Sequence, residues 1–577
     1  MRTTILLIFV CLAGKLFSQE FLNLGFEYEL RGSETPKKWW YTTSSGYIFK
    51  WDGNEKHESN RSLKITSNNP KENQSGVFTA SFPVDFAKGR KIELRGHLKT
   101  ESINNGYAGL WWKVDGQDGV LGFDNMENNG LKGTNDWQEV SLKMLVDEKA
   151  TEITFGGLLL GNGVAWYDNF EILIDGKTFN DLQPRSTEPT PDELAWLKKN
   201  VYPLSTYDPS TKSDEDLEVF GSLIGDAQVV ALGEVTHGSS EIFQMKHRLV
   251  KYLAEKKDFE IFSMEANLPE AYKLNDYVIE GKGNPKELLK GMRFWTWDTQ
   301  EILNMVEWMK LCNASKQKIQ FTGFDMQFYN LSFKELQKAL ESDINIMEDL
   351  AAIKQILDSN KAQHRNLPTS LLSRNNKDII EEKLENIKDA IAKLNISENS
   401  KEWLYQHVRI IEQYVAQTNH MIRNKFMAEN LLWIKSQNQG SKIAAWAHNG
   451  HIQRTMHGMG NYLSDSLMND YVAVGFAFSR GTYTAMGENG LTTYQAQVPY
   501  NGTFEKFFES IDVPIFIIDL RRIKEEKPMH AKWLLEKMDF RQVGSMKMKS
   551  EFYETDISED YDLILYINNS SGSKLLD

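Results

Sequence analysis

The chain has 577 residues, of which 41% are hydrophobic and 25% are charged, and its formal net charge is -14. This length exceeds what one ordinary hydrophobic core supports, so it predicts at least two domains. The acidic balance argues against nucleic acid and anionic membrane surfaces as partners, because phosphate binding needs clustered Lys and Arg.

The first residues, MRTTILLIFVCLAGKLFSQE, combine Arg2, a short apolar run and small or polar residues near Ser18. This pattern is typical of a secretory signal peptide, here residues 1–19, and is too short for a stable membrane-spanning helix. Once it is removed, Cys312 is the only cysteine, which excludes an intrachain disulfide. No later segment is apolar enough to span a bilayer. We therefore expect an exported protein, periplasmic or extracellular.

Residues 20–177 contain short runs of alternating apolar and polar residues, separated by Gly, Asn and Asp. This pattern predicts an antiparallel β-sandwich. The stretches FLNLGFE, SNRSLKITS and GNGVAWYDNFEILIDG resemble galactose-binding-like jelly rolls, the fold of many carbohydrate-binding modules. Trp39, Trp40, Trp111 and Trp112 are candidates to stack on a sugar, but tryptophan is largely buried on average, so we expect most of them in the core.

Residues 178–191, TFNDLQPRSTEPTP, are polar and proline-rich and predict a linker. From residue 192 to 577, apolar runs such as AQVVALGE, FEIFSME and SKIAAWAH alternate with amphipathic helical patterns. This alternation predicts an α/β domain with a mostly parallel sheet covered by helices. Residues 331–437 show only helical patterns, which indicates a long helical insertion that forms a wall or lid over the sheet.

Reactive side chains follow four of the predicted strands. In open parallel sheets, ligands bind outside the carboxyl ends of the strands, so we expect these side chains to converge on one cleft. They are Glu234 and His237 in VVALGEVTH, Glu265 in FSMEAN, Asp325 in FTGFDMQ, and His448 and His451 in AAWAHNGH.

Six motifs in this half resemble the erythromycin esterase family, in that family's order: LGEVTHGSSEIFQMKHRLVKYL, SMEANLPEAYKLNDYV, MRFWTWDTQEILNMVEWMK, FTGFDMQ, RNKFMAENLLWI and AAWAHNGHI. The resemblance implies hydrolysis of a macrolactone ester without a covalent intermediate. It implies His237 as general base, with Glu234, Glu265 and His448 as partners. Where arginine is expected after the first histidine, MKHR offers Lys246 and then Arg248, and Asn424 replaces the usual aspartate.

The residue types support the same chemistry. Ester hydrolysis needs a base near neutral pH and a positive or donor group for the developing oxyanion, which suits histidine held by carboxylates. We expect Arg293 to supply positive charge and Trp297 to form pocket wall; Asp325 and His451 can equally be structural. Ser239 and Ser240 are expected to be turn or cap residues. No Gly-x-Ser-x-Gly elbow is present.

Two other functions stay open. Glu-x-x-His with a further Glu and two His offers enough donors for zinc, manganese or a paired metal site, so a metal-dependent hydrolase is the second hypothesis. The third is a secreted glycan-binding protein with an inactive esterase-like domain. The preferred hypothesis needs no metal and no cofactor. Its partners are a small-molecule, macrolide-like ester and, at the N-terminal domain, a glycan.

Overall fold

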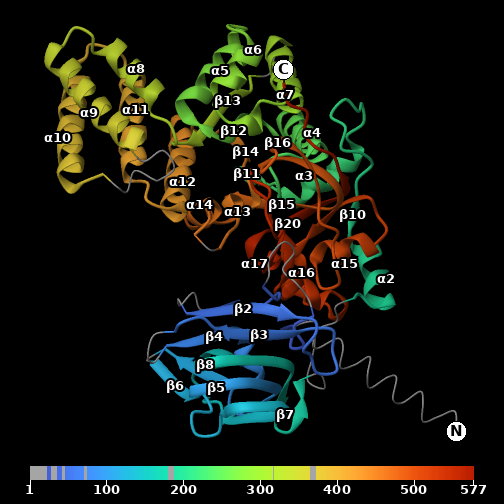
Figure 1. Cartoon of the computed structure of the whole chain (residues 1–577). Helices are drawn as coiled ribbons and strands as arrows, with labels where there is room; N and C mark the ends of the chain where they lie inside the picture. Colours follow the sequence, from blue (N-terminus) through green and yellow to red (C-terminus); the bar gives the residue numbers. More distant parts are fainter. Residues whose placement is uncertain are drawn as a thin grey trace. The chain divides into compact units, whose positions relative to one another are not determined.

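The computed structural model describes residues 22–27, 35–41, 46–70, 74–117, 119–179, 188–315, 318–363, 372–455 and 457–576. The chain divides into two compact units, Met1–Thr187 and Glu188–Asp577, coloured along the sequence in Figure 1. The predicted signal peptide and most of the predicted linker lie outside the described residues. Within the described part of the chain, no helix has the length and apolarity needed to cross a membrane.

The first unit is rich in antiparallel strands. Two long strands, β5 and β8, pair along most of their lengths, and the other strands join them edge to edge. The strands are β1 (Trp40–Tyr41), β2 (Tyr47–Asp52), β3 (Ser62–Ser67), β4 (Ser75–Phe82), β5 (Lys91–Gly116), β6 (Gly119–Asp124), β7 (Leu131–Leu145), β8 (Ala150–Ile174) and β9 (Lys177–Thr178). The period-2 alternation of the sequence is typical of antiparallel sheets that have one face on the core and the other in solvent.

The tryptophans of this unit divide between core and surface. Trp39 and Trp112 are buried, and Trp39 packs edge-on against Phe78 with 5.2 Å between ring centroids. Trp111 is half-buried and its Nε1 donates to the carbonyl oxygen of Phe78. Trp40 is 56% exposed. Of the four candidates for sugar stacking, Trp40 is therefore the one whose ring faces solvent.

The second unit is built on a sheet whose order is β10-β17-β20-β15-β11-β14-β12-β13, with β16 joined to β15. The five pairs from β20 to β13 are parallel, and β10 and β17 add antiparallel pairs at one edge. Its strands are β10 (Tyr202–Pro203), β11 (Val229–Leu232), β12 (Phe259–Asn267), β13 (Gln320–Asp325), β14 (Lys442–Trp446), β15 (Tyr471–Gly487), β16 (Gly490–Gln495), β17 (Ile515–Asp519) and β20 (Leu563–Ser570). A separate hairpin pairs β18 (Met538–Arg541) with β19 (Phe552–Thr555).

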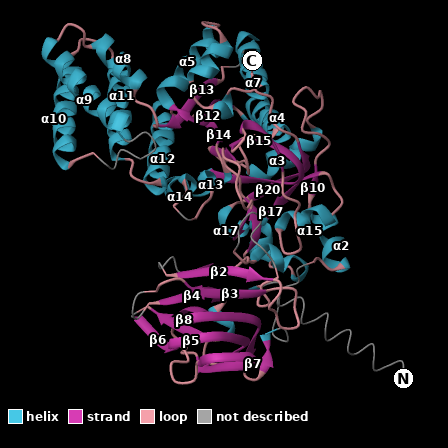
Figure 2. Cartoon of the chain, viewed as in Figure 1, coloured by secondary structure: helices cyan, strands magenta, loops and turns pink. Residues whose placement is uncertain are grey.

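Helices surround this sheet (Figure 2). The central strands are buried on both faces, as their near-continuous apolar runs require. The helices outside the insertion are α2 (Pro191–Asn200), α3 (Glu218–Ile224), α4 (Ser240–Lys257), α5 (Leu268–Glu280), α6 (Pro285–Gly291), α7 (Gln300–Ser315), α13 (Asn449–Ile452), α14 (Met459–Leu467), α15 (Phe504–Ser510), α16 (Leu520–Glu526) and α17 (Ile557–Asp560). Short 3-10 helices include η4 (Trp295–Trp297) and η7 (Met529–Leu535).

Between β13 and β14 the described chain is helical. The helices are α8 (Asn330–Ala339), α9 (Ile344–Gln363), α10 (Arg374–Lys393), α11 (Glu398–Ala416) and α12 (His420–Gln437). Helices α8 to α11 enclose an apolar core of their own, with Phe333, Leu384 and Val408 among its buried members. Helix α12 differs, because its Phe426, Met427 and Leu431 belong to the main core around the sheet.

Candidate active site

The carboxyl ends of β11, β12 and β14 open onto a pocket of about 270 Å³. These strands are parallel neighbours in the order β11-β14-β12, so the residues that follow them meet at one edge. The pocket is lined by His237, Glu265, Phe294, Thr296, Trp297, Gln327, Arg423, His448, His451, Gly544 and Ser545.

The first polar cluster of the site is built around Glu234. This carboxylate follows β11, is fully buried, and its Oε1 lies 2.6 Å from Nδ1 of His237. Its Oε2 accepts hydrogen bonds from Nζ of Lys246 at 2.8 Å and from Nε1 of Trp446 at 2.7 Å. Both carboxylate oxygens are thus occupied, and His237 is held in the tautomer that carries hydrogen on Nδ1.

His237 presents its other nitrogen for chemistry. It lines the pocket, with its ring edge-on to Trp297 at 5.7 Å between centroids. Within the described residues Nε2 of His237 makes no hydrogen bond, so a lone pair is left available to a substrate or water. An imidazole fixed on one side by a carboxylate and open on the other is the arrangement of a general base.

Opposing effects set the ionisation of this cluster. Burial lowers the pKa of His237, but the hydrogen bond and charge of Glu234 and the charge of Glu265 outweigh it, so the net pKa is raised. Burial raises the pKa of Glu234, yet Lys246 and His237 leave it lower than usual. Burial also lowers the pKa of Lys246 to about 8, against the attraction of Glu234. The carboxylate is therefore held ionised, and the histidine basic.

The second polar cluster is built around Glu265, at the end of β12. Its Oε1 accepts from Nη2 of Arg423 at 2.8 Å, and its Oε2 accepts from the backbone N–H of His448 at 3.0 Å. Arg423 also donates from Nη2 and Nε to the two oxygens of Asp325, at 2.6 and 3.2 Å. Burial alone raises the pKa of Glu265, but His451 and Arg423 hold it well below its usual range.

His451 joins this second cluster from α13. Its Nε2 lies 3.1 Å from Oε1 of Glu265 and 3.2 Å from Nη1 of Arg423. Its Nδ1 lies 2.6 Å from Oδ1 of Asn424, whose Nδ2 donates to the carbonyl oxygen of His457. That second bond fixes the amide orientation, so Nδ1 of His451 is the donor to Asn424. A neutral amide thus stands where the resemblance leads one to expect a carboxylate.

His448 uses both ring nitrogens on backbone groups. Nδ1 accepts the N–H of Gly450 at 3.1 Å, as the N-cap of α13. Nε2 lies 3.2 Å from the carbonyl oxygen of Val543 and 3.4 Å from that of Val235, so it carries the hydrogen. Burial and the neighbouring His237 and His451 lower the pKa of His448 to about 4. This imidazole is therefore neutral, and it connects the backbone of Val235, Val543 and Gly450 through hydrogen bonds.

The two arginines predicted to support the site, Arg248 and Arg293, are not among the residues that line the pocket. Lys246 and Arg248 are two positions apart on α4, about 200° around the helix axis, so they face opposite sides. Arg248 turns away from the site to pair with both oxygens of Asp216, at 2.5 and 3.0 Å. Arg293 is exposed, with its guanidinium 5.3 Å from the ring of Phe328. Neither guanidinium lines the pocket, and this corrects the expected source of positive charge.

The remaining predictions differ in outcome. Trp297 lines the pocket, and its Nε1 donates to the carbonyl oxygen of Glu265 at 3.0 Å. Asp325 is fully buried behind Arg423 and does not line the pocket. Ser239 is confirmed as a cap, because its side chain accepts the N–H of Ile242 at the start of α4.

Arg423 is the main residue that sequence reasoning missed. It lies in the stretch RNKFMAEN, which was read only for the asparagine that follows it. Its partners Glu265 and Asp325 are distant in sequence, so no local spacing marks it. Trp446, one residue before the end of an apolar run, was missed for a similar reason: its indole N–H serves a carboxylate that only the folded sheet brings near.

The carboxylates and imidazoles of the two clusters are the donors that a metal ion would need. Across the described residues, no group of three or more His, Cys, Asp or Glu side chains is arranged to hold a metal ion. The reason is visible in the bonding: Glu234 faces Lys246, Glu265 faces Arg423, and His448 is committed to backbone groups.

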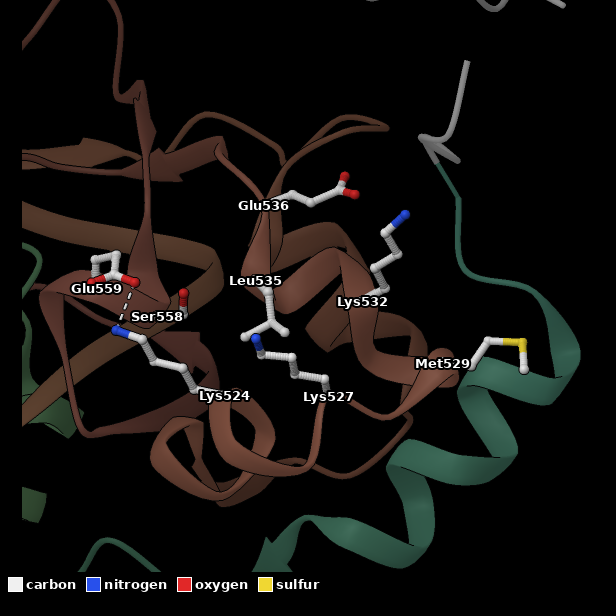
Figure 3. Close-up of a pocket in the computed structure, with 8 residues that line it drawn as sticks. All are labelled: Lys524, Lys527, Met529, Lys532, Leu535, Glu536, Ser558 and Glu559. Atoms are coloured by element: carbon white, nitrogen blue, oxygen red, sulfur yellow. Dashed lines mark ion pairs between the residues drawn. The ribbon is translucent and has the colours of Figure 1, made fainter. Parts of the chain in front are cut away.

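A larger pocket of about 460 Å³ lies elsewhere in the same unit, between α16, η7 and α17 (Figure 3). Lys524, Lys527, Lys532, Glu536 and Glu559 surround it, and Lys524 pairs with Glu559 at 2.6 Å. Among the described residues that line it there is no histidine and none of the predicted site residues. The smaller pocket, not the larger one, carries the base and the paired carboxylates.

The second unit is similar in sequence to known proteins. The family model described as erythromycin esterase matches residues 254–570, more than half of the chain. "Erythromycin esterase type II" of Escherichia coli is 23% identical over 428 residues, which cover 66% of this chain and 98% of that protein. Glu234 and His237 precede the segment matched by the family model, whereas Glu265, Arg423 and His448 lie within it.

Two solved structures resemble about two-thirds of this chain in fold. The crystal structure of a succinoglycan biosynthesis protein superposes with a TM-score of 0.57 at 28% identity, covering 67% of this chain and 98% of that one. A solved structure of an erythromycin esterase mutant in its open conformation superposes with a TM-score of 0.50 at 18% identity, covering 64% of this chain and 98% of that one. The second likeness concerns the fold alone.

Proposed function

The chain belongs to the erythromycin esterase family, and from that premise we propose that it hydrolyses a carboxylic ester by direct attack of a water molecule activated by His237. The observation that carries this proposal is the bonding of His237. Nδ1 is fixed by a buried, ionised Glu234, and Nε2 is open to the pocket. This geometry provides a base, and the raised pKa of His237 gives that base strength.

One imidazole serves both proton transfers in this mechanism. Nε2 of His237 takes a proton from water as the oxygen bonds to the ester carbon, and Glu234 stabilises the imidazolium that forms. The tetrahedral intermediate then loses the alkoxide, which takes the proton back from Nε2. The products are a carboxylic acid and an alcohol, and His237 returns to its starting state. His448 transfers no proton, because both its ring nitrogens are bonded to backbone groups.

Arg423 is the group proposed to face the oxyanion. It lines the pocket, and burial does not discharge it, because Glu265 and Asp325 hold its pKa above the ordinary value. A preformed positive group is worth most where water is excluded and where charge develops only in the transition state. Arg423 takes the role for which Arg293 was the candidate, since Arg293 lies outside the pocket.

The substrate class and location are extensions of this proposal. The first substrate to test is a macrolactone of the macrolide type, with other esters as alternatives. The leader-like residues 1–19 support export to the periplasm or the extracellular space. The antiparallel unit supports a galactose-binding-like jelly roll, with Trp40 exposed for stacking on a glycan. Such a unit would hold the enzyme at a glycan or cell surface.

Mass spectrometry of erythromycin incubated with the purified protein in heavy-oxygen water tests the proposal. We expect the mass of one water to be gained, with the heavy oxygen in the new carboxylate from the first turnover. His237→Ala should abolish the product, while Arg248→Lys, altered outside the pocket, should retain it. Enolisation and dehydration products are separated by chromatography.

The absence of a product from erythromycin and from a panel of acylated glycans would refute ester hydrolysis. Loss of activity on exhaustive chelation would favour the metal-dependent hypothesis.

A further inference from the structure

The segment that follows β20, residues 571–576, runs between the starts of helices α4 and α7. Isolated bridges join Ser239 to Gly572 and Thr299 to Leu575. Helix α4 begins three residues after His237, and α7 begins three residues after Trp297. The segment therefore touches both loops that present pocket side chains, although it does not line the pocket itself.

The segment satisfies the first backbone N–H of each helix. Ser240 N–H donates to the carbonyl oxygen of Ser571 at 2.9 Å, and Gln300 N–H donates to that of Lys574 at 2.7 Å. The first turn of a helix leaves such N–H groups without partners inside the helix. Residues distant in sequence supply the acceptors here, so one extended segment caps two helices.

Each helix returns a hydrogen bond through an acid in its first turn. Glu241 of α4 accepts the backbone N–H of Ser571 at 2.5 Å, and Glu301 of α7 accepts that of Lys574 at 3.2 Å. Glu301 also accepts the hydroxyl of Ser240 at 2.5 Å, which ties the two helix starts together. The reciprocity is that of a capping box, assembled between segments instead of within one, and both acids stand at the positive ends of helices.

The residue beside His237 is held from two sides. The carbonyl oxygen of Gly238 accepts the N–H of Ser573 at 2.8 Å and the N–H of Thr484 at 2.9 Å. A Cβ at position 238 would lie 1.9 Å from the carbonyl oxygen of Thr484, so only glycine fits between the loop and β15. The backbone next to His237 therefore has little freedom to move while Ser573 stays in place.

We propose that residues 571–576 cap helices α4 and α7 together and thereby fix His237 relative to Trp297. Glu301 is the central positioning residue of this arrangement. Glu301 neither lines the pocket nor contacts His237, so its effect is exerted through the two helix starts. Catalysis is sensitive to such placement, because an error of about 1 Å can lower a rate by roughly 100-fold. This inference rests on the proposed function for its kinetic consequence, but its structural consequence is independent of it.

The kinetic test compares Glu301→Ala with Glu301→Gln. Glu301→Ala removes every acceptor oxygen and is expected to lower kcat by about 10- to 100-fold, with KM changed by less than about threefold. Glu301→Gln keeps one acceptor oxygen and should recover most of kcat. The pH midpoint of the rate should stay at the wild-type value, because Glu301 does not bond to His237. Tyr566→Phe is the control: it removes the hydrogen bonds that the Tyr566 hydroxyl makes with the side chains of Ser479 and Asn568, and kcat should be unchanged.

Hydrogen exchange supplies a readout that needs no substrate. Peptides covering residues 233–243 and 296–303 should exchange faster in Glu301→Ala, and in Ser573→Pro for the first peptide, because the capping bonds are lost. Unchanged exchange in both peptides would overturn the proposal, as would a wild-type kcat in Glu301→Ala. If the wild type hydrolyses no ester while both peptides lose protection, the proposed function fails and the capping role stands.

Discussion

The pocket is bordered by two buried carboxylate clusters that differ in how their charge is balanced. Glu234 has one lysine, one indole and one imidazole as partners, and the other nitrogen of that imidazole bonds to no group in the described part of the chain. Glu265 faces an arginine that is itself shared with Asp325, together with a second histidine and a backbone amide. The first cluster can take up and release a proton without breaking apart. The second is saturated with charge-assisted bonds and is suited to hold a fixed field.

Lysine and arginine produce this difference. A lysine ammonium is a point charge whose pKa shifts on burial, and burial lowers that of Lys246 to about 8. Arg423 keeps its charge, because Glu265 and Asp325 raise its pKa against the effect of burial. The cluster proposed to take up and release a proton therefore contains the cation whose pKa is adjustable, and the cluster proposed to meet the oxyanion contains the permanently charged one.

The comparison is tested most severely by Glu234→Gln. We expect kcat to fall by about 1,000-fold, because His237 loses the anion that stabilises its imidazolium. Glu234 raises the pKa of His237, so its removal should move the rising limb of the pH–rate profile to lower pH. The variant leaves Lys246 buried without its carboxylate, so Tm should fall; Glu234→Gln with Lys246→Met should restore Tm and not kcat. A wild-type pH midpoint would contradict the assignment.

Glu265→Gln should have a smaller effect on the rate, about 10- to 100-fold in kcat, because Arg423 retains its two bonds to Asp325. The charge of Glu265 contributes less than that of Glu234 to the pKa of His237, so the pH midpoint should move down by less. Measuring both variants on one ester over pH 5–9 distinguishes the clusters, with the range chosen around the ordinary histidine pKa of about 6.5. Reversed sizes for the two effects would reverse the roles of the clusters.

His448→Ala distinguishes a structural role of His448 from a role as general acid. If His448 only holds Val543 and Val235 together, the loss in kcat should be roughly 10-fold and equal for an alkyl ester and a p-nitrophenyl ester. Loss of a general acid would instead penalise the alkyl ester far more, because an alkoxide is the poorer leaving group. His448→Gln keeps a donor near Nε2 and should recover activity on both esters. A selective loss on the alkyl ester would make His448 the acid.

Arg248→Met should show the smallest effect on rate, with kcat within about twofold of wild type, because Arg248 faces away from the pocket. Its guanidinium is buried against Asp216, so unfolding by urea should show a loss of about 3 kcal/mol. Arg248→Lys serves as the milder comparison. A large loss of kcat in a variant that stays folded would show that the face of α4 carrying Arg248 also contributes to catalysis.

Sequence reasoning located the strand ends but not the partners across them. Glu234 and His237 are three residues apart after an apolar run, so their meeting is a local matter. Arg423 and Glu265 meet only because the start of α12 lies close to the ends of β12 and β13, which no spacing in the chain reveals. Gly544 and Ser545 line the pocket from a loop with no chemical signature at all.

The arginine that was expected from the stretch MKHR shows the limit of proximity in sequence. Lys246 and Arg248 look equivalent as letters two positions apart, yet the helical period of 3.6 residues sends them to opposite faces. Reading that period along α4 would have selected Lys246 as the partner of Glu234. The direction of the Arg293 side chain could not be predicted in this way, because Arg293 lies in a loop with φ of 66° and follows no regular period.

The apolar core of helices α8 to α11 has a consequence for how the second unit unfolds. Those helices enclose residues such as Phe333 and Val408 among themselves, whereas α12, which carries Arg423, is anchored in the core of the sheet. Gln406 and Gln413 of α11 both donate to the side-chain oxygen of Asn430 in α12, so the bundle is tied to the helix that carries the arginine. Two cores joined through a buried polar contact are suited to unfold as two cooperative units, with Arg423 in the unit that contains the sheet.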